Sequence, residues 1–228
     1  MSLTLVSTPI GNPDDITLRA IETLKVSQSI ICEELKPARV LLKRLCIPEK
    51  PLYELNEHSQ ESELKELIEL CRSKKMALIS DCGTPGFSDP GADLVKACVK
   101  EKIQVDVNPG ASSLMALIAL CGIELKEFYF VGFLPAERNE RAKKLEQLQW
   151  VKVPMVFMDT PYRLGSTIKE LALVWPKRSG IVGVDLTGGH HQVHRDLLGE
   201  LSKKEWPKLP FMIIVKNRIY KVAPARKI

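Results

Sequence analysis

The first half of the chain alternates between short apolar runs and longer stretches in which apolar residues recur at helical spacing. The apolar runs predict strands at 3–6, 29–32, 52–55, 76–80 and 103–107, and the periodic stretches predict helices at 16–25, 37–45, 59–75, 92–100 and up to about 120. The clearest helix is 59–75, with acidic residues early and two lysines at its end. Strands and helices in alternation predict a parallel sheet that helices cover on both faces.

The second half carries the same two kinds of pattern. Strands are predicted at 128–131, 155–158, 180–186 and 211–215, with a highly charged helix at 138–149 and another that follows 163 and runs to about 173. A domain boundary is predicted near 121–122, where an apolar helix ends and the charge balance changes. We therefore expect an α/β protein with domains at 1–121 and 122–228.

The charge of the chain is unevenly spread. Residues 1–121 contain 14 Lys and Arg against 17 Asp and Glu, whereas residues 122–228 contain 19 against 11. A basic second half is as consistent with an anionic partner such as RNA as with an ordinary solvated surface. The start of the 138–149 helix is basic, which is unfavourable for the helix dipole and so suggests an anionic partner, with a solvated face as the alternative.

Composition narrows the class of protein further. With 45% hydrophobic and 27% charged residues, the chain has the make-up of a soluble globular protein. Its longest apolar runs are too short to span a bilayer, and its N-terminus enters an apolar strand without the features of a signal peptide. The six cysteines are scattered singly, so neither a disulfide framework nor a metal knuckle is predicted. We expect a cytoplasmic protein that does not bind membranes.

Three loops rich in Gly, Pro and Ser follow predicted strands, at 7–13, 80–91 and 108–113. In the central loop, three glycines allow close approach of a ligand and two prolines make the backbone stiff. Asp89 and Pro90 have the pattern of an N-cap followed by proline at the first helical position. Because ligands bind at the carboxyl ends of strands in parallel sheets, the coincidence of three such loops predicts a ligand site.

For several other polar residues, the sequence allows either a functional or a purely structural role. Glu33 and Glu34 follow the second strand, where they could hold a ribose hydroxyl or simply be solvated acids. The histidines 190, 191 and 194 have no acidic or cysteine ligand near them in sequence, so we expect no metal. Cys82 lacks a basic neighbour in sequence and is predicted to be a packing residue rather than a nucleophile. No nucleophile elbow or phosphate-binding lysine loop is present.

The motifs taken together resemble one known family. They are Ser7-Thr8-Pro9-Ile10-Gly11-Asn12, Ser80-Asp81 with Gly83-Thr84-Pro85-Gly86 and Ser88-Asp89-Pro90-Gly91, Pro109-Gly110 with Ser112, Gly132-Phe133-Leu134-Pro135, Thr160-Pro161-Tyr162-Arg163 and Asp185-Leu186-Thr187. This ordered set, which covers nearly the whole chain, resembles the tetrapyrrole (corrin/porphyrin) methylase superfamily. Within it, the set is most similar to the branch that 2′-O-methylates a cytidine of small-subunit ribosomal RNA.

The resemblance implies a fold, a cofactor and a partner. It implies two α/β domains with mainly parallel sheets, S-adenosylmethionine as cofactor in the cleft between them, a homodimer, and small-subunit (16S) ribosomal RNA as acceptor. Carried over residue by residue, it places the cofactor beside Ile10, Gly11, Asp81, Gly83, Thr84, Pro85, Ser112, Ser113, Met158, Leu186 and Pro210. Because a ribose hydroxyl is a poor nucleophile, a general base or charge stabiliser is expected, and Glu33 and Arg163 are the candidates.

Two segments depart from the ribosomal branch. That branch carries Ala-Glu-Asp-Thr-Arg after the second strand, where this chain has Cys32-Glu33-Glu34-Leu35-Lys36, and a Lys-Leu-His-Glu type of run where this chain has Gly188-Gly189-His190-His191. Both segments fall where the substrate would be handled. Two alternatives therefore stay open: methyl transfer to a tetrapyrrole or another small anionic molecule, and a catalytically idle RNA-binding scaffold.

Overall fold

The computed structural model describes residues 1–87 and 91–217. The chain divides into two compact units, Met1–Ser112 and Ser113–Ile228, and each is described here by itself. The predicted N-cap at Asp89 and Pro90 and the basic end of the chain lie outside the described residues.

Unit 1 is built on a parallel sheet with the strand order β3-β2-β4-β1-β5. Its strands are β1 (Ser2–Val6), β2 (Ser29–Cys32), β3 (Leu52–Glu54), β4 (Lys75–Leu78) and β5 (Gln104–Asn108). β1 lies between β4 and β5, with Leu3 opposite Met76 on one side and Val105 on the other. All five strands predicted for this half are confirmed.

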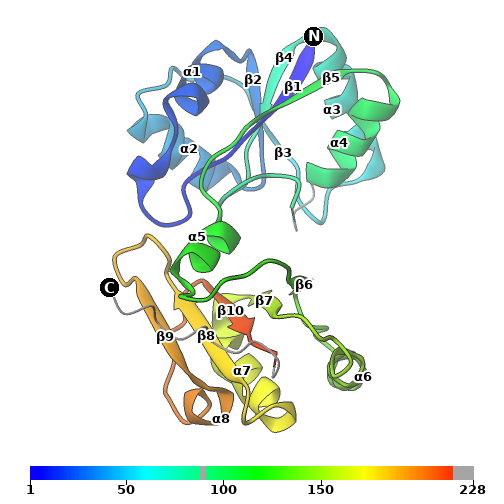
Figure 1. Ribbon diagram of the computed structural model, residues 1–228. Coiled ribbons are helices and arrows are strands. Elements are labelled where there is room, and N and C mark those ends of the chain that lie inside the picture. Colours follow the sequence, from blue (N-terminus) through cyan, green and yellow to red (C-terminus); the bar gives the residue numbers. More distant parts are fainter. Residues whose placement is uncertain (88–90, 218–228) are drawn as a thin grey trace. The chain divides into compact units, whose positions relative to one another are not determined.

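Helices cover both faces of this sheet, as predicted (Figure 1). They are α1 (Leu18–Val26), α2 (Leu35–Arg44), α3 (Glu61–Ser73) and α4 (Gly91–Lys100). Alternate strand residues point to opposite faces. Val6 and Ile30 therefore pack in the cluster under α1 and α2, while Leu3 and Ile31 pack in the cluster under α3 and α4.

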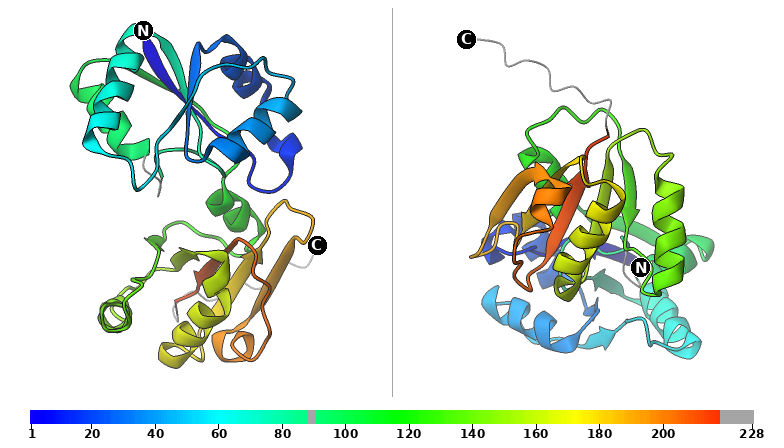
Figure 2. Two further views of the ribbon diagram at one scale, coloured as in Figure 1. Left: turned by 180° about the vertical axis from the view of Figure 1, so that it is seen from behind. Right: turned by 90° about the horizontal axis from the view of Figure 1, so that it is seen from below.

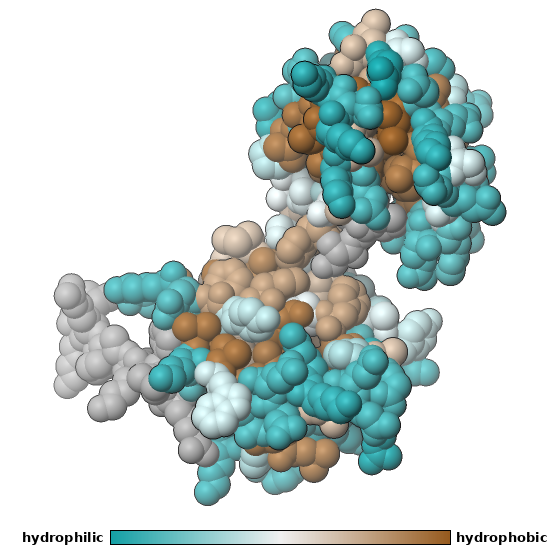
Figure 3. All heavy atoms as spheres, turned by 90° about the vertical axis from the view of Figure 1, so that its right-hand side faces the viewer, coloured by the Kyte–Doolittle hydropathy of each residue, from teal (hydrophilic) through white to brown (hydrophobic). Residues whose placement is uncertain are grey.

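The helices of unit 1 begin where capping groups are available. Thr17 Oγ1 accepts a hydrogen bond from the Ala20 N–H at 3.1 Å at the start of α1. A capping box opens α3, because Glu63 Oε2 accepts from the Gln60 N–H at 2.7 Å. Figure 2 shows α1 and α2 on one side of the sheet and α3 and α4 on the other. The α3 and α4 side of unit 1 is mostly hydrophilic in Figure 3.

The connections of unit 1 locate a topological switch point. β1 and β4 are neighbours, yet the chain leaves β1 toward α1 on one face and leaves β4 toward α4 on the opposite face. In open α/β sheets, ligands bind outside the carboxyl ends of two such strands. Those ends lead into the 7–13 and 80–91 loops, two of the three that the sequence singled out.

Unit 2 has a mixed sheet with the order β6-β7-β10-β8-β9. Its strands are β6 (Tyr129–Gly132), β7 (Met155–Asp159), β8 (Ser179–Val184), β9 (Gln192–Leu197) and β10 (Phe211–Val215). Only the β6–β7 pair is parallel in the described part of this sheet, and the other three pairs are antiparallel. The α/β class is thus confirmed, but the expectation of mainly parallel sheets holds for unit 1 alone, because β9 and β10 return antiparallel.

β9 was not predicted from the sequence. It is an edge strand whose residues are exposed or half-buried, so it lacks the apolar run by which the other strands were recognised. The helices α6 (Arg138–Leu148), α7 (Leu164–Val174) and α8 (Leu198–Leu201) pack on one face of the sheet around Phe157, Ile168 and Leu198. No helix in the described residues is long and apolar enough to cross a membrane.

The helix α5 (Ser113–Leu120) packs on the other face of the sheet of unit 2. A Cβ atom on Gly183 of β8 would lie 2.8 Å from Leu117 Cδ1, so the helix approaches the strand where there is no side chain. The Arg195 guanidinium also donates a hydrogen bond to the Leu120 carbonyl. The division of the chain therefore falls before α5, whereas the boundary predicted from the sequence at 121–122 falls after it.

Candidate cofactor site

The first and central loops of unit 1 are joined directly. The Thr8 N–H donates to the Gly83 carbonyl at 2.8 Å, and Thr8 Oγ1 donates to the Ser80 carbonyl at 3.0 Å. The hydroxyls of Ser7 and Thr84 share a hydrogen bond of 2.8 Å. Ser7 and Thr8 are only 2% exposed, so these contacts are buried and hold the two loops in one arrangement.

The third loop packs against the first two. A Cβ atom on Gly110 would lie 2.8 Å from Ser7 Cβ, so only glycine allows this approach. A Cβ atom on Gly83 would lie 3.5 Å from Ile10 Cγ2 and 3.8 Å from the Ala111 carbonyl oxygen. The structure thus brings the three sequence-predicted loops together at the carboxyl edge of the sheet.

The central loop turns sharply where its glycines are placed. Gly83 and Gly86 both have φ = +87°, which residues with a side chain rarely adopt. Pro85 is buried between them, and Thr84 is half-buried. Backbone groups, small side chains and hydroxyls are therefore what this edge offers to a ligand.

An acidic cluster lies at the end of β2, next to the central loop. The Asp81 N–H donates to Glu33 Oε2 at 3.4 Å, and the Glu34 N–H donates to Asp81 Oδ1 at 3.3 Å. Partial burial raises the pKa of Asp81, and the nearby Glu34 carboxylate adds to this, although the Glu34 N–H opposes it. Burial, with Glu54 and Asp81, raises the pKa of Cys32 to about 12.

Cys82 has the environment of an unreactive thiol. Its Sγ donates to the Ile10 carbonyl at 3.8 Å. Desolvation of the thiol, together with the carboxylates of Asp81 and Glu33, raises its pKa. A thiol with a raised pKa is a poor nucleophile, but Cys82 is exposed, so the packing role predicted from the sequence stays a prediction.

The three predicted residues of the second half also lie together. Met158 is on β7, Leu186 follows β8, and Pro210 precedes β10, which runs antiparallel between those two strands. The Asp185 N–H donates to the Pro210 carbonyl at 2.8 Å. Ser112 and Ser113 fall at the division between the units, and both are half-buried.

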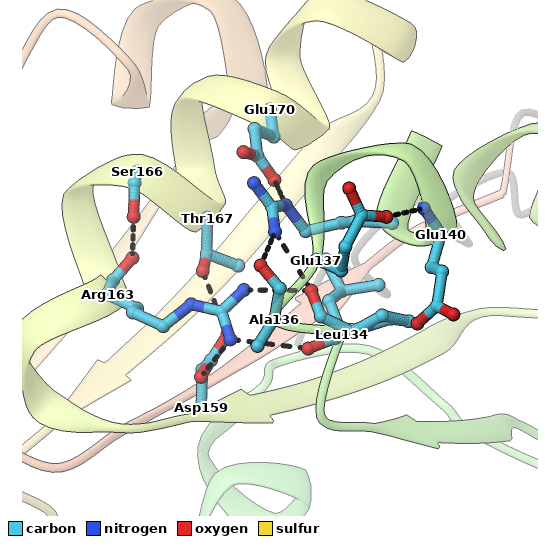
Figure 4. Close-up of polar contacts among 11 residues, drawn as sticks. Leu134, Ala136, Glu137, Glu140, Asp159, Arg163, Ser166, Thr167 and Glu170 are labelled. Atoms are coloured by element: carbon cyan, nitrogen blue, oxygen red, sulfur yellow. Dashed lines mark hydrogen bonds and ion pairs between the residues drawn. The ribbon is translucent and has the colours of Figure 1, made fainter. Parts of the chain in front are cut away.

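Two arginines of unit 2 hold the turn that follows β6 (Figure 4). Arg141 forms an ion pair with Glu170 at 2.6 Å and donates to the carbonyls of Pro135 and Ala136 at 2.9 and 2.6 Å. Arg163 pairs with the buried Asp159 at 3.3 Å, and its guanidinium donates to two carbonyls of the 134–135 segment.

These contacts change the interpretation of two basic residues. Arg141 belongs to the basic helix start for which the sequence leaves open an anionic partner or a solvated face, but its side chain is only 14% exposed and binds Glu170. The ion pair of Arg163 with Asp159 and its hydrogen bonds to Leu134 and Pro135 are likewise within unit 2, which fits a residue that positions the 132–136 turn. Its candidate role as a charge stabiliser stays a prediction.

The histidine-rich segment forms a tight turn. Asp185 and Thr187 have φ of 47° and 64°, and the His190 N–H donates to Asp185 Oδ2 at 2.7 Å. His191 Nδ1 accepts a hydrogen bond from the Thr187 N–H at 3.1 Å. Within residues 1–87 and 91–217, no group of three His, Cys, Asp or Glu side chains is arranged to hold a metal ion.

The sequence did not single out Ser7 and Thr8 as individual site residues, although both stand in a motif that it named. The sequence feature that could have identified them is a pair of hydroxyl residues at the end of a buried strand, because buried hydroxyls need hydrogen-bond partners. Those partners are Thr84, Ser80 and Gly83, which are remote in sequence, so they could not be identified from the pattern alone.

The fold and the three joined loops define a class: α/β proteins that bind a small ligand at the switch point of a parallel sheet. A sequence model of the tetrapyrrole (corrin/porphyrin) methylases matches residues 2–202. The chain belongs to this family. The family assignment expected from the motifs, and with it an S-adenosylmethionine-dependent methyltransferase, is confirmed.

Similar proteins support this assignment. The ribosomal RNA small subunit methyltransferase I of Halalkalibacterium halodurans is 35% identical over 98% of this chain and 78% of its own length. The proteins with the same name in Thermotoga maritima and Coprothermobacter proteolyticus are both 37% identical, over 87% and 92% of this chain and 89% and 95% of their own lengths.

Solved structures share the fold at low sequence identity. A diphthine synthase aligns with a TM-score of 0.76 over 97% of this chain and 92% of its own, at 16% identity. The uroporphyrin III C-methyl transferase of Thermus thermophilus aligns with a TM-score of 0.65 over 94% of this chain and 97% of its own, at 19% identity. These two likenesses support the fold.

Proposed function

We propose that this protein transfers a methyl group from S-adenosylmethionine to a ribose 2′-hydroxyl of small-subunit (16S) ribosomal RNA. The observation that carries the proposal is the identity of 35–37% to small-subunit ribosomal RNA methyltransferases along most of the chain. The basic balance of residues 122–228 is consistent with an anionic acceptor.

The donor would be held by the joined loops of unit 1. Gly83 and Gly110 let the three loops pack closely, Gly11 presents no side chain, and Thr84 and the serines 112 and 113 offer hydroxyls. The bound sulfonium supplies an activated methyl group and a good leaving group. The loops would position this group and exclude water, and such alignment contributes about 7–11 kcal/mol in well-oriented reactions. The cofactor roles of Ile10, Asp81, Pro85, Met158, Leu186 and Pro210 belong to the same proposal.

The acceptor hydroxyl must lose its proton during transfer. Glu33 is the better placed of the two candidates, because its carboxylate is held by the Asp81 N–H at the edge of the loop cluster. Asp81, with its raised pKa, is a neighbour that could share the proton. Arg163 would act indirectly, through the turn that it holds.

Labelled methyl transfer tests the proposal. The protein is incubated with methyl-labelled S-adenosylmethionine and, separately, with 30S particles, naked small-subunit RNA and a tetrapyrrole precursor. A 2′-O-methyl group blocks alkaline cleavage of the adjacent phosphodiester, so we expect label in RNA that is recovered as an alkali-resistant dinucleotide. Label on a base or on the tetrapyrrole would refute ribose methylation.

The same experiment separates the catalytically idle alternative. S-adenosylmethionine binding without label in any acceptor would indicate a scaffold that keeps the donor site. Absence of donor binding to the well-folded protein would refute the donor site itself. The proposed homodimer is measured separately, by light scattering in the presence and absence of RNA.

A further inference from the structure

A pocket of unit 1 lies beside the donor loops, between them and helix α2. Its volume is ≈ 220 Å³, and its walls include Thr8, Ser80 and Asp81 from the first and central loops. Prolines 9, 13 and 37 and the side chains of Val40 and Leu41 form most of the remaining wall. The wall is therefore mainly apolar, with a few polar groups where it meets the donor loops.

The helix that lines this pocket is basic along its whole length. α2 contains Lys36, Arg39, Lys43 and Arg44 and no acidic residue, although residues 1–121 as a whole have more acidic than basic residues. Arg44 also lines the pocket and pairs with Asp14 at 3.0 Å. All four are exposed, and of these four only Arg44 lines the pocket.

Helix stability does not account for this arrangement. Basic residues near the carboxyl end of a helix interact well with its dipole, which explains Lys43 and Arg44. Lys36 lies in the first turn, where a positive charge opposes the dipole, and Arg39 is in the middle. Val40, which is 64% exposed, adds an apolar side chain among these charges. Exposed cations on the solvent face of α2, next to an apolar pocket that Val40 and Arg44 line, match a nucleotide, whose phosphate is anionic and whose base has an apolar face.

We propose that this pocket binds the base of one unpaired nucleotide of the RNA substrate, while Arg39 and Lys43, on the solvent face of α2, contact phosphates of the nucleotides that flank it. The inference rests on the proposed function, because it assigns a binding surface to the same RNA. The shared walls at Thr8, Ser80 and Asp81 would bring that nucleotide next to the donor loops. Proline and aliphatic faces can stack on any base, so the pocket would select an extruded base rather than a paired one.

Helix α4 offers a matched control on the opposite face of the same sheet. Lys96 and Lys100 are exposed and have the same i, i+4 spacing as Arg39 and Lys43. We compare the double variants Arg39→Gln/Lys43→Gln and Lys96→Gln/Lys100→Gln, which change the net charge equally. The probe is a fluorescein-labelled single-stranded oligoribonucleotide of about 12 nucleotides, measured by anisotropy at several salt concentrations.

We expect the α2 variant to bind this RNA at least tenfold more weakly than the α4 variant at low salt. The slope of a plot of log binding constant against log salt concentration should be smaller in magnitude by about 1.4 for the α2 variant than for the α4 variant. Two phosphate contacts are lost, and each contributes about 0.7 for single strands. S-adenosylmethionine binding, measured by calorimetry, should be equal in the two variants. Equal RNA affinities and slopes in the two variants would overturn the proposal.

A second pair of variants tests the pocket rather than the charges. Val40→Ser is compared with Val99→Ser on α4, because these valines are 64% and 62% exposed. The wild-type protein should prefer the intact oligonucleotide over one with abasic riboses by about 5- to 150-fold, and Val40→Ser should reduce this preference. No preference for bases in the wild type, or displacement of RNA by polyglutamate at equal charge concentration, would refute a nucleotide pocket in favour of a general anion surface.

The two proposals fail in different ways. If the α2 variants methylate and bind RNA as the α4 variants do, the pocket inference is wrong while the proposed function stands. If the wild-type protein transfers label to a tetrapyrrole and to no RNA, the proposed function fails, and the pocket inference fails with it.

Discussion

Replacing Gly110 by alanine tests whether the first and third loops pack as the structure shows. The added Cβ would lie 2.8 Å from Ser7 Cβ, whereas carbon atoms in contact normally lie about 3.5–4.0 Å apart. One of the loops must therefore move by about 1 Å. Gly110 does not have a positive φ, so the backbone itself accepts alanine and the steric contact alone is tested.

The magnitude follows from the cost of overpacking, which is about 1–3 kcal/mol for an added methyl group in a well-packed site. For a chain of this size, that corresponds to a fall in Tm of roughly 2–12 °C. Ser7 also holds Thr84 through a 2.8 Å hydrogen bond, so the shift should weaken S-adenosylmethionine binding by roughly tenfold, which is about 1.4 kcal/mol.

Thermal unfolding and calorimetric titration of the donor are the assays. Gly189→Ala is the control, because nothing lies within 4 Å of a Cβ atom at that exposed position. In a Ser7→Gly background, Gly110→Ala should cost much less stability, since the opposing Cβ is gone. Equal Tm and donor affinity in Gly110→Ala and Gly189→Ala would refute the close packing of these loops.

Two further predictions concern charge and pH. Arg141→Gln should lower the free energy of unfolding by about 1–2 kcal/mol in a urea titration, because the Glu170 ion pair and the carbonyl contacts are lost, while Lys143→Gln on the exposed side of the helix should change it little. An equal effect of the two substitutions would contradict a stabilising role for the contacts of Arg141 with Glu170 and the 135–136 carbonyls. The Cys32 thiol has its pKa raised from 9.0 to about 12, so the folded state holds its proton more tightly and stability should be lost as pH rises from 9.0 toward 12. Cys32→Ala should flatten this decline and Cys46→Ala, at an exposed position, should not.

The sequence was a good guide where structure depends on local pattern. The strands of unit 1 have buried apolar runs and its helices have one apolar stripe, so both periods were visible without tertiary information. β9 lacked that signal because it is an exposed edge strand. The sheet on which α5 packs was not visible in the sequence either, since an apolar helix shows that it is buried without showing which sheet it is buried against.

The three loops show most clearly what can be predicted from the sequence and what only the tertiary structure reveals. Their glycines and prolines mark three ligand loops in the sequence, because such residues have few other uses at strand ends. The sequence could not show that Ser7 bonds Thr84, 77 residues away, or that Gly110 approaches Ser7 closely. These contacts depend on β1 lying between β4 and β5, and strand order is decided by how the helices pack on the two faces of the sheet. Local sequence thus determined the elements and the chemistry at their ends, and only the tertiary structure decided which ends meet.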